Sequence, residues 1–318
     1  MPIWFKIEER HESSGVMLKT FNRLKQNAAV NPKLLRLEPE EIAGLQRVLL
    51  DMLKDFDLIC KQNNLQYILT GGSALGAERN GGFIEWDDDI DVLMPREDYE
   101  KLAQCVHDQA AEKYWVQSLY TSDVYDLNFM KFRKNGTRYV ELFEPEPEKA
   151  GICIDVYPLD VAPSWKISSI IYGIINEALF FAASCVRMYC KRERLLEYIS
   201  DHEIRRSIEF KACIGKLLFD RCRPRKWYFL CERWAKKVVD AQPEYMAVSS
   251  GRGHYFGERY KREKLFPAIE RTFEGIGVCM AKDNDYLLSV LYGPKYILPP
   301  KESEREVHSV IELRLYGK

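Results

Sequence analysis

This sequence has no surplus of charge of either sign. Its 47 Lys and Arg residues nearly balance its 48 Asp and Glu residues, giving a formal net charge of −1. A protein held on a nucleic-acid backbone usually carries a strongly basic balance, so we expect no nucleic-acid partner. With 46% hydrophobic and 30% charged residues, the 318-residue chain can instead bury the core of one or two globular domains.

The sequence also lacks the cysteine and histidine spacings of disulfide-rich and zinc-binding proteins. Its nine cysteines are odd in number, scattered and never spaced as CxxC, which is typical of reduced thiols. Its five histidines form no HxxH or HExxH motif, so zinc-dependent hydrolysis is poorly supported. His254 and His308 could each be a base, a ligand or a structural residue, and the sequence leaves their roles open.

Long uncharged hydrophobic runs are absent as well. The first fifteen residues carry charges throughout and lack the apolar stretch of a secretory signal, so we expect a cytoplasmic protein. The most apolar segment, residues 167–189, is interrupted by Asn176, Glu177 and Arg187. A spanning helix needs about 20 largely uncharged residues, so we expect a buried or interfacial helix there. The basic run at residues 191–194 leaves peripheral contact with the inner face of an anionic membrane open.

The first half of the chain contains alternating helix and strand patterns. Apolar residues between Ile42 and Ile59 repeat at spacings of three and four, which predicts an amphipathic helix. Further helices are expected at residues 71–77 and 96–108. Strands are expected at residues 67–70, 90–94, 115–119, 128–132, 138–142 and 151–157. Together these elements predict an α/β (α+β) fold with a mixed β-sheet core and flanking helices.

The strand patterns stop between Ser164 and Ala241, where apolar residues recur at helical spacing. They return from Met246, and a last helix is expected at residues 283–291. We therefore predict a catalytic core at residues 1–160 and a helical insertion or subdomain at 161–245. Residues 246–318 would form a C-terminal segment that completes the core and the substrate site.

The run WDDDIDVLM at residues 86–94 concentrates carboxylates at the start of an apolar strand. If the extended geometry begins at Asp87, side-chain alternation puts Asp87, Asp89 and Asp91 on one face and Asp88 on the other. Three acids that converge in this way are costly unless a cation neutralises them. Oxygen ligands of this kind suit Mg²⁺ or Mn²⁺. An exposed acidic loop or a Ca²⁺ site is the alternative.

A second strand offers one more acid, Asp155, between β-branched neighbours. It would form the third corner of a site for two metal ions. The alternative is a solvent-facing strand residue, because strand alternation by itself would also place it there.

Gly71-Gly72-Ser73 lies between an expected strand and an expected helix. Glycines at such a turn let the backbone approach a ligand, and free amides at the helix start attract phosphate. The motif alone is more often a plain turn. A Gly-Ser turn, then an acid-hydrophobe-acid strand, then a later third acid is nevertheless the signature of nucleotidyltransferase-fold enzymes.

The block GGSALGAERNGGFIEWDDDIDVLMPREDYEKL, residues 71–102, closely resembles the signature of the LicD family, which is related to the fukutin group. Residues 131–141, 151–160 and 292–300 resemble later blocks of the family. The resemblance implies transfer of a phospho-alcohol from a CDP-activated donor to a sugar hydroxyl of a cell-surface glycan, with release of CMP. CDP-choline is the favoured donor. The acceptor would be a glycan or lipid-linked glycan of lipopolysaccharide, teichoic acid or capsule.

The resemblance also implies roles for the acids. Asp89 and Asp91 would hold two Mg²⁺ or Mn²⁺ ions, and Asp87 would support the cluster. Asp155 would hold one ion and accept the proton of the attacking hydroxyl. Phosphoryl transfer needs mainly positioning and charge neutralisation, which these groups would supply.

Donor-binding groups are expected in the matching blocks: Gly72, Ser73, Arg79, Lys131 and Arg133. Lys131 and Arg133 lie two positions apart on one strand and can therefore point the same way. Solvated strand charges are the alternative for both.

Two rival functions stay open. A nucleotidyltransferase acting on a small molecule would keep the fold and change the chemistry. A non-catalytic glycan-binding or partner-binding protein would keep only the scaffold, although all four acids are present.

Overall fold

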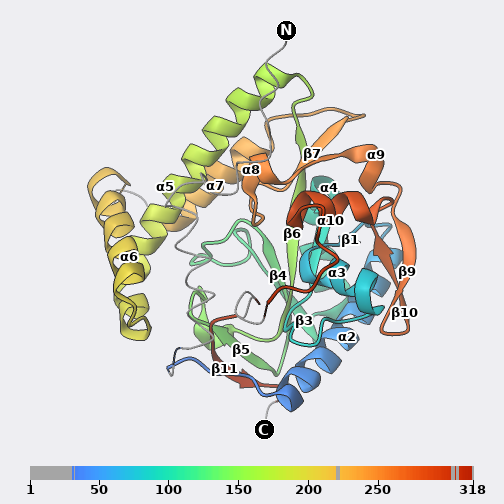
Figure 1. Cartoon of the computed structure of the whole chain (residues 1–318), viewed down its shortest axis with the longest axis horizontal. Helices are drawn as coiled ribbons and strands as arrows, with labels where there is room; N and C mark the ends of the chain where they lie inside the picture. The colour runs from blue at the N-terminus through green and yellow to red at the C-terminus, as the bar shows by residue number, and fades with distance from the viewer. Residues whose placement is uncertain (1–30, 32, 220–222, 302–304, 306–307, 317–318) are drawn as a thin grey trace.

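A mixed seven-stranded sheet forms the centre of the protein (Figure 1). The structure is a computed structural model that describes residue 31 and residues 33–219, 223–301, 305 and 308–316. Five strands follow in the order β1-β2-β6-β4-β3, and β7 pairs with both β6 and β8. Helices flank this sheet, which confirms the expected mixed α/β fold.

Most elements lie close to the positions that the sequence predicts. The helices are α2 (Pro39–Gln62), α3 (Gly71–Asn80), α4 (Arg96–Ala110), α5 (Lys166–Tyr198), α6 (His202–Ile214), α7 (Pro224–Ala235), α8 (His254–Gly257), α9 (Arg262–Leu265) and α10 (Asn284–Tyr292). The strands are β1 (Ile68–Leu69), β2 (Asp91–Pro95), β3 (Tyr114–Gln117), β4 (Met130–Lys134), β5 (Arg138–Glu141), β6 (Cys153–Ala162), β7 (Tyr245–Ala247), β8 (Arg259–Lys261), β9 (Ile269–Phe273), β10 (Ile276–Met280) and β11 (Val310–Arg314). The expectation that fails is a strand start at Asp87, because β2 begins at Asp91.

Helix α2 begins at a capping box in which Glu38 and Glu41 satisfy each other's backbone amides, with Pro39 in the first turn. Its buried residues recur at spacings of three and four and belong to the main hydrophobic core. Helix α2 packs on α4 and β6, and α4 also packs on β2 and β3. These two helices therefore hold the strands that carry the acids.

Strand β6 is the central strand. It runs parallel to β2 and antiparallel to β4, and the register pairs Asp155 with Asp91 on one side and with Lys131 on the other. Because parallel neighbours start at the same edge of a sheet, the two acids come to the same place. This register links the three sequence blocks that carry candidate site residues.

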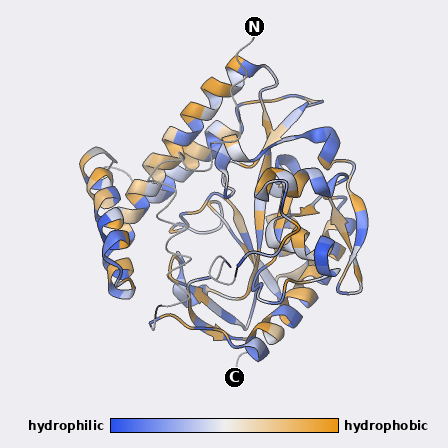
Figure 2. Ribbon diagram, in the orientation of Figure 1, coloured by the Kyte–Doolittle hydropathy of each residue, from blue (hydrophilic) through white to orange (hydrophobic). Residues whose placement is uncertain are grey.

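The segment between the strands β6 and β7 is helical, as expected. Helix α5 packs against α6 and α7, and its apolar residues run along much of its length (Figure 2). Strand β6 continues to Ala162 and β7 begins at Tyr245, so both predicted domain boundaries fall inside strands. The division into three segments stays a prediction.

By length and composition, α5 is the one helix among the described residues that could cross a membrane. Of its most apolar window, 44% is buried inside the protein, and a core helix of a globular protein can pass the same test of length and composition. Two cations of the basic run that follows are used inside the molecule: Lys191 donates to the carbonyl of Phe143, and Arg194 to those of Glu141 and Glu144. Peripheral contact of this run with a membrane stays a prediction.

The C-terminal part returns to the first half of the chain. Strands β9 and β10 form a hairpin, and α10 packs against α3. Strand β11 pairs antiparallel with β5, and Leu35 donates its amide to the carbonyl of Val310. This pairing brings residues near 310 to the acid cluster.

Candidate active site

The glycine turn at the start of α3 forms a cradle for two carboxylates. A Cβ atom added at Gly71 would lie 2.7 Å from Asp91 Oδ2, and one added at Gly72 would lie 2.6 Å from Asp87 Oδ2. Gly71 also has a φ of 57°, which favours glycine. Only residues without a side chain let these acids approach the positive end of α3 so closely.

Ser73 fixes the same corner from inside the helix. Its hydroxyl oxygen accepts the backbone amide of Asp91 at 3.0 Å, and the carbonyl of Asp91 accepts the amide of Thr70, also at 3.0 Å. Ser73 is 1% exposed. In this structure it positions the first residue of β2, and its predicted contact with the donor stays a prediction.

Asp88 and Asp89 lie in the loop before β2, where Asp88 is buried and Asp89 is partly exposed. Asp88 is buried, accepts a hydrogen bond from the Tyr139 hydroxyl at 2.9 Å, and lies 2.6 Å from His308 Nδ1. The other ring nitrogen, Nε2, lies 3.4 Å from Asp89 Oδ2. Asp88 is therefore held on the buried side of the loop between Tyr139 and His308, and its predicted milder role than that of Asp89 stays a prediction.

Electrostatics explain how a buried acid stays charged at this point. Burial by itself raises the pKa of Asp88, but the charge and hydrogen bond of His308 and the hydroxyl of Tyr139 bring it below its usual range. His308 thus bridges two neighbouring acids and joins the segment before β11 to the acid loop.

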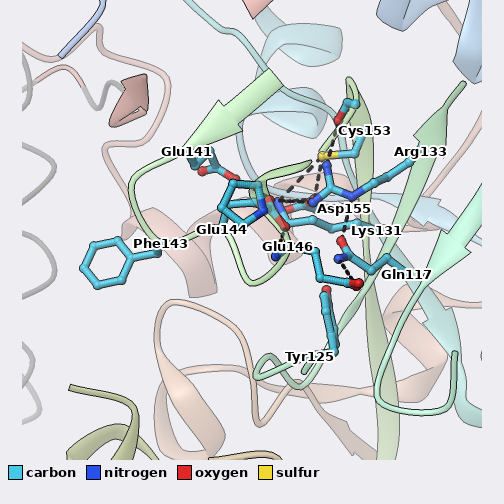
Figure 3. A network of polar contacts seen from close by, with 12 residues as sticks. Gln117, Tyr125, Lys131, Arg133, Glu141, Phe143, Glu144, Glu146, Cys153 and Asp155 are labelled. Atoms are coloured by element: carbon cyan, nitrogen blue, oxygen red, sulfur yellow. Dashed lines mark hydrogen bonds and ion pairs between the residues drawn. The ribbon is translucent and has the colours of Figure 1, made fainter. Parts of the chain in front are cut away.

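Lys131 supplies a positive charge beside Asp155 (Figure 3). Its Nζ lies 3.1 Å from Asp155 Oδ1 and 2.9 Å from Glu141 Oε2, and the residue is 4% exposed. Burial alone lowers the pKa of Lys131, but Asp155, Cys153 and Glu141 raise it well above the usual value. Burial likewise raises the pKa of Glu141, but the positive charge and hydrogen bond of Lys131 have the larger opposite effect and lower this pKa to about 2. Lys131 therefore stays charged at neutral pH.

Arg133 points to the same side of β4 but has a different environment. Its three guanidinium nitrogens donate to Gln117 Oε1 at 2.6 Å, to the carbonyl of Gly151 at 2.7 Å and to Glu144 Oε2 at 2.6 Å (Figure 3). The side chain is fully buried. To clamp a phosphate as predicted, Arg133 would have to leave these partners.

The remaining predicted residues lie farther away. Arg79 lies in the last turn of α3, seven residues after Gly72, which corresponds to about 10 Å along the helix axis. His254 lies at the start of α8, and its ring contacts Phe180 on α5. The structure does not bring His254 to the acids, whereas it does bring His308 there.

A small cavity lies where these groups meet. It is lined by Leu45, Asp88, Asp89, Lys131, Tyr139, Glu141, Ile152, Cys153, Asp155 and His308. Its volume is about 10 Å³, roughly the space that one water molecule needs. A substrate must therefore approach Asp89 and Asp155 from outside, or the lining side chains must move.

The donor set fits a hard divalent cation chemically. Asp87, Asp89, Asp91 and Asp155 offer only carboxylate oxygens, and the glycine cradle leaves room for two of them to converge on α3. Within the described residues, no three acid, histidine or cysteine side chains stand in the arrangement of a ready metal site. Instead, Lys131 forms an ion pair with Asp155, and His308 Nε2 lies beside Asp89. Metal binding stays a prediction.

Sequence reasoning missed Glu141 and the hydroxyl of Tyr139. Both lie on β5, inside a block that resembles the family, and β5 pairs with β11. The available signal was their spacing of two along that strand, which places both side chains on one face.

Comparison with known proteins adds two findings. Residues 64–158 match the model of the nucleotidyltransferase domain of LicD, FKTN and FKRP. This segment contains the glycine cradle and all four predicted metal ligands. The chain is also 24% identical, over 275 residues, to the lipopolysaccharide cholinephosphotransferase LicD of Haemophilus influenzae, an alignment that covers 83% of this chain and 94% of that relative.

Proposed function

Because the chain belongs to the LicD family and is a phosphotransferase, we propose that it transfers phosphocholine from CDP-choline to a sugar hydroxyl of a lipopolysaccharide or similar glycan. The observation that supports this chemistry best is the β2–β6 register. It sets Asp155 beside Asp91, and Asp91 in turn lies directly against the glycine turn of α3.

In this proposal the acceptor oxygen attacks the phosphorus that carries choline, and the bond from that phosphorus to the CMP oxygen breaks. The hydroxyl proton passes to the Asp155 carboxylate, and CMP leaves. Lys131 holds Asp155 in place and offsets negative charge that gathers beside it. The Gly71-Gly72 turn and Ser73 fix Asp87 and Asp91 so that little reorganisation is needed during the reaction.

We further propose that Asp87, Asp89, Asp91 and Asp155 hold Mg²⁺ or Mn²⁺, most simply as two ions. When bound, these ions would neutralise the diphosphate and orient it. The backbone of Gly72 would lie nearest to the donor phosphates at the start of α3. Of the expected cations, Lys131 is the one that lines the small cavity with Asp89 and Asp155.

The test is a calorimetric titration of CDP-choline, CDP-ribitol, CTP and CMP, first with Mg²⁺ and then with EDTA. We expect CDP-choline to bind only with the metal and its choline phosphate to appear on lipopolysaccharide. Asp89→Asn should abolish both binding of the metal and transfer. Asp51→Asn, the same change at an exposed acid of α2, is the control.

Each other outcome would redirect the proposal. Preference for CDP-ribitol would change the alcohol, and turnover of CTP would indicate a nucleotidyltransferase. Binding of a glycan without any cytidine nucleotide would favour the non-catalytic alternative. Near-normal transfer by Asp89→Asn would contradict the metal mechanism.

We also propose that the protein acts in the cytoplasm at the inner face of the membrane, where a lipid-linked acceptor would be reached. The first turns of α5 support this idea, because they expose a row of large apolar side chains. The row comprises Trp165, Ile167, Ile170, Ile171 and Ile174. Trp at one end and isoleucines along one face suit the boundary between headgroups and acyl chains.

Flotation with phosphatidylglycerol-containing vesicles tests this contact. Ile171→Glu should reduce the bound fraction, whereas Leu58→Glu, which changes an exposed apolar residue on α2, should not. Equal binding by both variants would contradict the proposed membrane face.

A further inference from the structure

A second, much larger cavity lies at the far end of α3 from the acids. Its volume is about 770 Å³, within the range of small-molecule sites. It is an open pocket bordered by α3, the β9–β10 hairpin, α9 and the start of α10, which lie next to one another in Figure 1. None of the predicted site residues lines this cavity.

The most buried polar side chain of the described lining is that of Asn284, which is 9% exposed. Its Nδ2 donates to Glu78 Oε2 at 3.0 Å. This bond fixes the orientation of the amide, because a carboxylate can only accept. The other amide atom, Oδ1, is buried and accepts no hydrogen bond from any described residue. Asn284 therefore holds an unsatisfied acceptor in the wall of the cavity, which a ligand with N–H or O–H groups would satisfy once a small movement of the wall exposes it.

The rim mixes donors and acceptors. Lys264, Lys282 and Arg271 can donate, whereas Glu78, Glu263, Asp283 and Asp285 can accept. A hydroxyl group both donates and accepts, so a ligand with several hydroxyls can use both kinds of partner. Ala77 and Ile269, which are half-buried, add an apolar surface on which the C–H face of a ring can rest, and the buried Met280 belongs to the same lining.

Other ligand classes fit this lining less well. A phosphate would meet four carboxylates and only three cations. A quaternary ammonium needs an aromatic cage, and no described residue of the lining is aromatic. A saccharide satisfies the polar rim and the apolar surface together.

We propose that this cavity binds a saccharide unit of the acceptor glycan, remote from the unit that receives the phospho-alcohol. This inference rests on the proposed function. Glu78 lies six residues after Gly72, so the cavity begins about 9 Å along the α3 axis from the glycine cradle. A glycan of several units can lie along α3 with one end at the cavity and the other at the acids.

The test uses Met280, whose side chain lines the cavity, as a reporter. In protein with ¹³C-labelled methionine methyl groups, Met280→Leu assigns its signal among the eight methionines. The probe is the core oligosaccharide released from bacterial lipopolysaccharide by mild acid, and CMP is the comparison. The oligosaccharide should shift the Met280 signal, and CMP should not. No shift at millimolar oligosaccharide, or a shift with CMP instead, would overturn the inference.

Variants link the signal to the cavity. Asn284→Ala should weaken oligosaccharide binding by about tenfold, the effect of losing one hydrogen bond to a buried group. Arg271→Gln, at the exposed rim, provides a second variant that does not disturb the core. Lys54→Gln on α2 is the control and should bind normally. Normal binding by both Asn284→Ala and Arg271→Gln would also overturn the inference.

The two proposals fail in different ways. If choline phosphate is transferred but the Met280 signal never responds to the oligosaccharide, the saccharide site is wrong and the transferase stands. If the oligosaccharide shifts Met280 but no CDP-alcohol is used, the saccharide site stands and the proposed donor chemistry is wrong.

Discussion

Alanine substitutions at two glycines can distinguish the effect of backbone strain from the effect of displacing a carboxylate of the site. In Gly71→Ala, the new methyl group would lie 2.7 Å from Asp91 Oδ2, so the carboxylate must move by about 0.7 Å to reach the ordinary contact distance of 3.4 Å. Gly71 also has a positive φ, where an L-residue costs about 1–2 kcal/mol. Displacement of a reacting group by about 1 Å can lower the rate on the order of 10²-fold.

Gly136 supplies the matched control. It has a φ of 74° in the β4–β5 turn, but a Cβ there would meet nothing within 4 Å. Gly136→Ala should therefore lose the same 1–2 kcal/mol in urea unfolding and keep its activity. Gly71→Ala should lose similar stability and, in addition, most of its kcat/KM for phosphocholine transfer. Equal activity of the two variants would refute the role of the cradle.

Three further predictions concern buried charges. Glu144→Gln should lower the free energy of unfolding by about 3–5 kcal/mol, because it leaves the fully buried guanidinium of Arg133 without its carboxylate; a loss below 1 kcal/mol in urea titration would contradict this. Burial raises the pKa of Glu258 from 4.5 to about 7, so its contribution to stability is complete below pH 4.5 and is lost as the pH rises through about 7. Urea titrations between pH 5 and 8 should thus show a steeper decline for the wild type than for Glu258→Gln. Asp88→Asn should lower the free energy of unfolding by about 1–3 kcal/mol, because it weakens the buried contact with His308; a loss in urea titration no larger than that of Asp51→Asn, at an exposed acid, would contradict this.

Local patterns in the sequence predict the elements and part of the site. The acids at the start of an apolar strand mark Asp91, an acid between β-branched residues marks Asp155, and the glycine turn marks the start of α3. These features depend on neighbours in the chain, which is why they can be recognised without a structure. The positions of the Asp87–Asp89 side chains cannot be predicted in this way. This stretch is a loop, and its path depends on contacts with Gly72, Tyr139 and His308.

Contacts between distant segments account for most of what the sequence does not reveal. His308 reaches Asp88 across 220 positions because β11 pairs with β5. Asn284 reaches Glu78 across 206 positions because α10 packs on α3. Neither pairing leaves a periodic signal, since each depends on tertiary packing rather than on local conformation.

Lys131 and Arg133 show why a strand pattern predicts the face of a side chain but not its role. Both lie on the same face of β4, as expected, yet the register sets Lys131 opposite Asp155 and Arg133 opposite Cys153. A shift of two residues along β4 therefore decides the partner of the cation: Lys131 pairs with Asp155 at the site, whereas Arg133 pairs with the buried Glu144. The register between two strands decides which residue of the partner strand lies opposite a given side chain. That register cannot be read from the pattern of a single strand.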